Sequence, residues 1–123
     1  MSVGVQKVRF YNVPVEEPPG EPGTAAGSAL AILRAVAKPV DFVAIKVDID
    51  GGPELEIVRA IAESPELASL VDELFYEHHF WTGGKWFFLG AHANNRTHAG
   101  DVKYAVGLMT RLRELGVRAH QWP

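Results

Sequence analysis

The stretch "DFVAIKVDIDGGPELEIV", residues 41–58, decides the fold of this chain. Its first ten residues are nearly continuous in apolar side chains, which is typical of a parallel strand covered on both faces. A Gly-Gly pair then breaks the run, and Pro53 stands at a natural first position of a helix whose first turn is acidic. The stretch therefore predicts a strand over 41–50, a tight turn and a helix over 51–64.

Similar signals flank this unit on both sides. Ser28 has the side chain of an N-cap and Pro39 is a stop signal, so we expect a short helix between them. Periodicity and turn residues predict the remaining elements: a strand over 5–13, a short helix over 64–71, a strand over 72–80, a helix over 101–116 and a strand over 117–122. Alternating strands and helices imply right-handed crossovers and a mostly parallel sheet. We therefore expect a three-layer α/β fold.

The length of 123 residues fits one domain, residues 1–123, and hardly permits two. Two segments lack the pattern of a regular element. Residues 14–27 are rich in proline and glycine, and residues 81–100 read as a long loop. A loop of about 20 residues in a compact domain is usually functional or disordered.

Composition excludes several classes of protein. With 47% hydrophobic and 22% charged residues, the chain matches an ordinary globular protein. A net charge of −3 argues against a nucleic-acid partner. The absence of cysteine excludes disulfides, thiolate metal sites and a cysteine nucleophile. The apolar runs are far shorter than the roughly 20 residues of a membrane span, and the first residues lack a signal-peptide core. We expect a soluble intracellular protein.

Titratable residues follow two of the predicted strands. Ligands of open α/β sheets lie beyond the carboxyl ends of the strands. Because side chains alternate along a strand, Asp48 and Asp50 share one face, Glu77 and His79 share a face of the next strand, and His78 points the other way. If these strands are neighbours, the four residues of the two same-face pairs meet at one rim. Such a group suits acid/base chemistry or a divalent metal ion.

A structural interpretation of the same residues stays open. Lys46, in the middle of its strand, would need an anionic partner if it were buried, and Glu73 or Glu77 would supply it. Asp48 and Asp50 would then cap the following glycine turn through bonds from their side chains to the backbone.

Two blocks of residues carry a resemblance to a known family. The first is Lys46, Asp48, Asp50 and Gly51 with Glu54 or Glu56, and the second is Glu77 with His78 or His79. This combination resembles the later half of FkbM-type methyltransferase domains, most strongly over residues 41–80 and more loosely from about 7 to 122. The ending "GLMTRLRELGVRAHQW" also resembles that of plant and algal proteins with the same combination, which are mostly uncharacterised.

The resemblance implies a Rossmann-like sheet and methyl transfer from S-adenosylmethionine to an oxygen. In that family the methyl donor is bound by the first strand, a glycine-rich turn and an acidic residue after the second strand. All of these would lie before residue 1, so we expect a sheet that is incomplete in its N-terminal half and no cofactor bound by the chain alone. The rims at Asp48/Asp50 and Glu77/His79 would form the acceptor side of the pocket.

Three functions follow from these observations. The first is a truncated or divergent methyltransferase-like domain that is non-catalytic alone and serves as a subunit or accessory domain. The second is an O-methyltransferase that uses S-adenosylmethionine once a missing N-terminal half is supplied. The third is a small metal-dependent enzyme built on the aspartate, glutamate and histidine residues at the strand ends. The strand at 41–50 would also have an open edge, covered by strand 5–13, a protein partner or a second copy.

Overall fold

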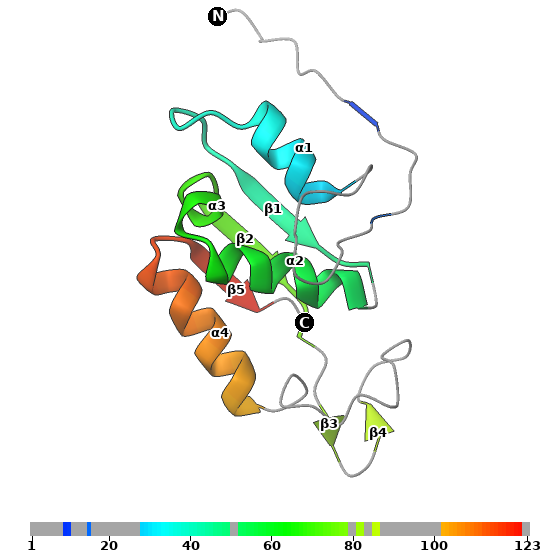
Figure 1. Ribbon diagram of the computed structural model, residues 1–123. Coiled ribbons are helices and arrows are strands. Elements are labelled where there is room, and N and C mark those ends of the chain that lie inside the picture. Colours follow the sequence, from blue (N-terminus) through cyan, green and yellow to red (C-terminus); the bar gives the residue numbers. More distant parts are fainter. Residues whose placement is uncertain are drawn as a thin grey trace, which may run out of the picture.

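A parallel sheet with helices packed on one face forms the body of the computed structural model (Figure 1). The structure describes residues 9–10, 15, 28–49, 52–78, 81–82, 85–86 and 102–121. The main elements are α1 (Ala29–Val36), β1 (Ala44–Val47), α2 (Gly52–Glu63), α3 (Pro65–Ser69), β2 (Glu73–Tyr76), α4 (Val102–Glu114) and β5 (Arg118–Gln121). These elements confirm an α/β fold.

The sheet has the strand order β1-β2-β5, and both neighbouring pairs are parallel. The helices α2 and α3 connect β1 to β2, and α4 precedes β5. The central strand is therefore β2, and its end is flanked by the ends of both neighbours. The strands at 41–50 and 72–80 are therefore parallel neighbours, which is the condition on which the shared rim depends.

The helices begin and end where the sequence predicts. The Ser28 hydroxyl accepts a hydrogen bond from the Ala31 N–H at 3.2 Å, and the Ser64 hydroxyl accepts one from the Leu67 N–H at 3.2 Å. Each satisfies a backbone donor that the first turn of a helix leaves unpaired. Gly116, just after α4, has a φ of 92°, a left-handed conformation that glycine adopts without steric cost.

The hydrophobic core lies between the helices and one face of the sheet. From the sheet, alternate residues such as Val47, Leu74 and Ala119 point into it. The helices contribute Leu30 and Leu33 from α1, Ile57, Val58 and Ile61 from α2, Leu67 from α3, and Leu108 and Leu112 from α4. Because all four helices contribute to one core cluster, they cover the same face of the sheet.

The other face of the sheet corrects one expectation. Phe42 is 63% exposed, and the side chains of Lys46, Asp48, Arg118 and His120 are exposed as well. No described helix lies over these residues, so the described part has two layers and not three. The reason is that β1 and β5 carry charged or polar residues at alternate positions, and burying them would cost desolvation energy. Each of these strands is amphipathic, and the prediction of a strand covered on both faces is wrong.

The segment expected as a long loop starts with regular structure. The strands β3 (Trp81–Thr82) and β4 (Lys85–Trp86) pair antiparallel as a short hairpin. The rest of the segment lies outside the described residues, as does most of the strand predicted over 5–13. Among the described helices, none has the length and apolar character needed to cross a bilayer.

Candidate functional site

The carboxyl ends of β1 and β2 form the candidate site. The register pairs Val47 with Tyr76, so Asp48 and Glu77, the next residue of each strand, stand at equivalent positions beyond the paired ends. The edge expected for a ligand therefore carries a carboxylate from each strand. Asp50 and His79 lie outside the described residues, and their part in the site remains a prediction.

Lys46 does not have the partner that the structural interpretation assigned to it. Its Nζ lies 2.8 Å from a carboxylate oxygen of Asp48, and the two side chains are 48% and 42% exposed. Residues two apart on a strand share a face, which is why the nearest anion comes from the same strand. An exposed ion pair of this kind contributes about 0–1 kcal/mol. The expected pairing of a buried Lys46 with Glu73 or Glu77 is therefore wrong.

The open face of the sheet holds further contacts between strands. The His120 Nε2 lies 2.9 Å from a carboxylate oxygen of Glu73, and its ring stacks on Phe75 with centroids 4.8 Å apart. The Arg118 guanidinium lies 5.4 Å from the centre of the Phe42 ring, within the range of a cation–π contact. This face is therefore organised by specific polar and aromatic pairs.

A buried polar cluster lies on the opposite face, beneath the helices. The side chains of Glu54, Tyr76 and His78 are 1%, 2% and 1% exposed. The Tyr76 hydroxyl and the His78 Nδ1 are 3.2 Å apart, a hydrogen-bonding distance, and the Tyr104 ring centre is 6.2 Å from that of His78. We call these four residues the inner cluster.

The environment of the inner cluster favours neutral phenols. Burial raises the pKa of Tyr76 well above its ordinary value, and the negative charges of Glu54 and then Tyr104 act in the same direction. Burial is also the main reason that the pKa of Tyr104 is raised, although the nearby Arg59 guanidinium opposes this. Both hydroxyls therefore keep their protons at neutral pH and can act as hydrogen-bond donors.

Sequence reasoning placed His78 on this face but did not assemble the inner cluster. The signal was available in part, because Tyr76 and His78 alternate with Glu77 along the strand. Glu54 could also be placed at the start of the helix that follows the strand at 41–50. The contribution of Tyr104 could not be derived, because it depends on how α4 packs against α2.

A metal site is not assembled by the side chains that the structure describes. Across the described ranges, no group of three or more histidine, aspartate or glutamate side chains is placed to hold a metal ion. The described rim offers hydrogen-bond acceptors, Asp48 and Glu77, on the open face, whereas the phenol–imidazole pair of Tyr76 and His78 is buried beneath the helices. The two carboxylates can hold and orient a hydroxyl-bearing molecule.

An apolar hollow lies beside β1, on the side of α1. Its volume is about 310 Å³. It is lined mainly by Leu30, Leu33 and Val36 of α1, Ile45 and Val47 of β1, and Ile49. Ile49 directly follows Asp48, but successive side chains of a strand point to opposite faces, so the hollow lies on the helix side of the end of β1 and the Asp48 carboxylate on the open side.

Comparisons with protein-family models, with curated proteins and with solved structures found no match for this chain.

Proposed function

We propose that this chain is a methyltransferase-like α/β domain that supplies the acceptor side of a binding site and acts as a non-catalytic subunit or accessory domain of an assembly. The observation that carries the proposal is the parallel register of β1 and β2, which sets Asp48 and Glu77 side by side beyond the strand ends. This is the place where open α/β sheets bind their ligands.

The acceptor would be a small molecule with a hydroxyl group. The carboxylates of Asp48 and Glu77 can accept a hydrogen bond from that hydroxyl, and such charge-assisted bonds are stronger than neutral ones. Lys46 pairs with Asp48 and holds its carboxylate in place. The apolar hollow beside Ile49 would receive the body of a molecule that extends around the end of β1 to the helix side.

The role as a subunit is supported by the uncovered parts of the sheet. In the described sheet β1 is an edge strand, and such edges invite pairing with another strand. The open face adds the exposed ring of Phe42 beside Arg118. A protein partner would cover both features if it paired a strand with the edge of β1 and also packed on the open face.

Calorimetry with S-adenosylmethionine tests the non-catalytic part of the proposal. We expect no measurable binding by the isolated chain. Binding near micromolar affinity would contradict the proposal and favour the O-methyltransferase alternative, in which Asp50 or His79 orients or deprotonates the acceptor hydroxyl.

The acceptor side is tested by two-dimensional NMR with small polyols, phenols and monosaccharides. We expect the ligands to shift the amide signals of Asp48 and Glu77, and the variant with Asp48→Asn and Glu77→Gln to lose these shifts. Glu114→Gln, an exposed change on α4, is the matched control and should keep them. Shifts confined to other surfaces would overturn the assignment of the site.

A further inference from the structure

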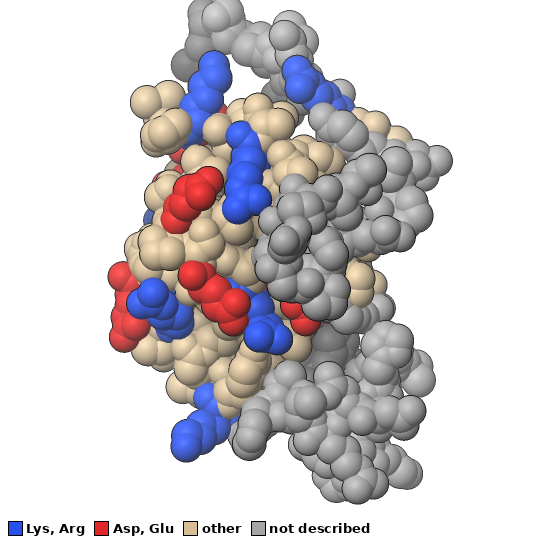
Figure 2. Space-filling view, in the orientation of Figure 1, with Lys and Arg blue, Asp and Glu red and all other residues tan. Residues whose placement is uncertain are grey.

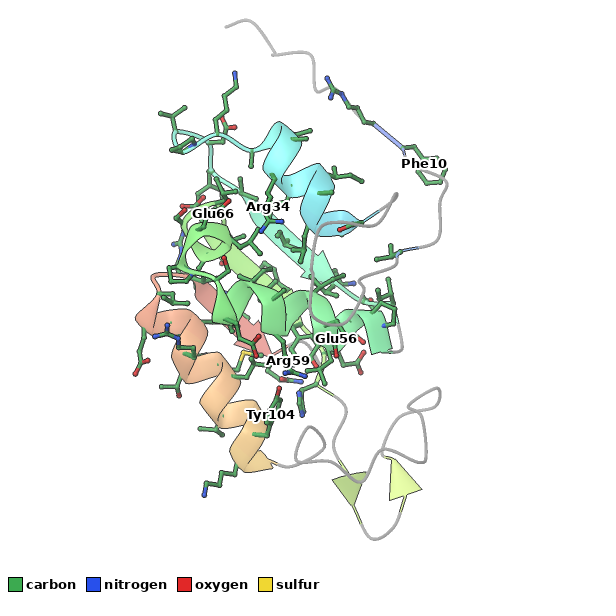
Figure 3. All side chains as sticks on the ribbon, viewed as in Figure 1. Phe10, Arg34, Glu56, Arg59, Glu66 and Tyr104 are labelled. Atoms are coloured by element: carbon green, nitrogen blue, oxygen red, sulfur yellow. The ribbon has the colours of Figure 1, made fainter. Side chains whose placement is uncertain are left out.

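A groove between α2 and α4 lies on the helix side of the molecule, away from the open face of the sheet. Its volume is about 660 Å³, within the range of small-molecule sites. It is lined by Arg59, Ala62 and Glu63 of α2 and by Lys103, Tyr104, Gly107, Leu108 and Arg111 of α4. In Figure 3, Arg59 and Tyr104 extend toward each other from the two helices.

The charge of the groove is opposite to that of the chain. Three cationic side chains and one carboxylate line it, although the chain as a whole has a net charge of −3. Figure 2 shows acidic and basic side chains interspersed over the surrounding helix face. An excess of positive charge above an apolar floor complements an anionic ligand with an apolar body.

The two arginines keep donors for such a ligand. Arg59 lies 3.8 Å from Glu56 and 3.4 Å from Glu63, and Arg111 lies 3.9 Å from Glu114. These separations exceed the roughly 2.7–2.9 Å of a strong charge-assisted hydrogen bond. A guanidinium has five N–H donors in a planar fork that matches a carboxylate. Because each guanidinium has more N–H donors than these pairs use, both arginines can still donate to an anion in the groove.

The glycine at position 107 is explained better by a ligand in the groove than by the requirements of the helix. A glycine inside a helix is less stable than alanine by about 1 kcal/mol. A Cβ added at Gly107 would meet no atom within 4 Å, so packing does not demand a glycine there. Because Gly107 lines the groove, a larger side chain at this position would occupy the space that a ligand needs.

We propose that the α2/α4 groove binds a small aromatic or aliphatic carboxylate. Arg59 and Arg111 pair with the carboxylate, the Tyr104 ring and Leu108 contact the apolar body, and Gly107 lets that body approach the helix backbone. This site is separate from the rim at Asp48 and Glu77 and does not depend on the function proposed for it.

Titration with 2-naphthoate, followed by two-dimensional NMR of the whole chain, tests the proposal. We expect saturable shifts at Tyr104 and Gly107, and no saturable shifts with the neutral 2-naphthalenemethanol. Arg59→Gln and Arg111→Gln should each weaken binding by about tenfold, as the loss of one charge-assisted hydrogen bond implies. Arg34→Gln on α1, which removes an exposed arginine paired with Glu66, is the matched control and should bind normally.

The glycine gives a second, independent test. Gly107→Ala should keep naphthoate binding and raise the melting temperature, whereas Gly107→Phe should abolish binding with the spectrum of the core unchanged. If Gly107→Phe does not fold, the arginine variants decide. Equal binding of the neutral analogue, or equal weakening by Arg34→Gln, would overturn the proposal. Binding of 2-naphthyl phosphate in place of 2-naphthoate would overturn the choice of a carboxylate.

Discussion

At the scale of single residues, the inner cluster shows how burial sets the chemistry of this molecule. The phenol of Tyr76 is buried in the core and lies 3.2 Å from the His78 ring nitrogen. Glu54, from the first turn of α2, is buried near it. A charged phenol in this place would be desolvated next to a carboxylate, so the folded state holds the proton of Tyr76 tightly.

The raised pKa of Tyr76 predicts how the stability of the protein changes in alkaline solution. The pKa of Tyr76 is raised above its ordinary value of 10.0 in the folded state. Above about pH 10 the unfolded chain loses the proton and the folded chain keeps it, so the free energy of unfolding falls as pH rises. Tyr76→Phe should make this fall shallower. At pH 8 the same variant should lose about 0.5–1.5 kcal/mol of stability, the contribution of one hydrogen bond.

Urea unfolding between pH 8 and pH 11 measures both effects. Lysines also titrate in this range, but they do so in both proteins and cancel in the difference. Tyr104→Phe is the control and should have a smaller effect, because Tyr104 is only partly buried. Identical slopes for the wild-type protein and Tyr76→Phe would show that the phenol is not protected by the fold.

At the scale of helices and strands, local side chains set where the elements begin. The helix α3 has only five residues and too few backbone hydrogen bonds to be stable alone. It is held by the Ser64 cap at its start and by the burial of Leu67 and Ala68. The Ser64 cap therefore contributes a large part of the interactions that stabilise α3.

Replacing the cap should have a measurable cost. We expect Ser64→Ala to lower the free energy of unfolding by about 1 kcal/mol, the usual value for an N-cap. Ser64→Asp should restore most of it, since a carboxylate also accepts the Leu67 N–H and suits the positive end of the helix. Ser69→Ala, at the exposed end of α3, is the matched control. Equal stability of Ser64→Ala and the wild-type protein in urea would contradict this account.

The elements also show what can be derived from sequence. Caps and stops such as Ser28, Ser64 and Gly116 act within a few residues, so local patterns predicted them. The strand at 41–50 was correctly placed, but its two covered faces were not. The nearly continuous apolar run favours a buried strand, whereas the alternation of Lys46 and Asp48 marks the face that is exposed. The pairing of residues 81–86 into a hairpin was not predicted, because its strands are only two residues long.

At the scale of the whole molecule, the arrangement of the helices separates two surfaces with different properties. All four described helices cover one face of the sheet, and the α2/α4 groove lies among them. The other face carries charged and aromatic pairs from all three strands. This division depends on long-range packing and on which strands lie at the edges. Sequence patterns predicted a mostly parallel sheet but could not show which face of that sheet would lack a helix.

The edge of β1 gives the last prediction. The Val43 carbonyl accepts hydrogen bonds from the amides of Asp72 and Glu73, so it points toward β2. Because successive residues of a strand point their backbone groups to opposite sides, the Ala44 amide points toward the free edge of the described sheet.

If another chain covers this edge, hydrogen exchange at Ala44 should slow as protein concentration rises, while exchange at Leu74 in the central strand stays slow throughout. Light scattering should show a rise in mass over the same range of concentrations. The opposite outcome is strong protection of the Ala44 amide from exchange at every protein concentration, in a chain of monomer mass. It would show that the chain covers its own edge, and the proposed assembly through β1 would have to be abandoned.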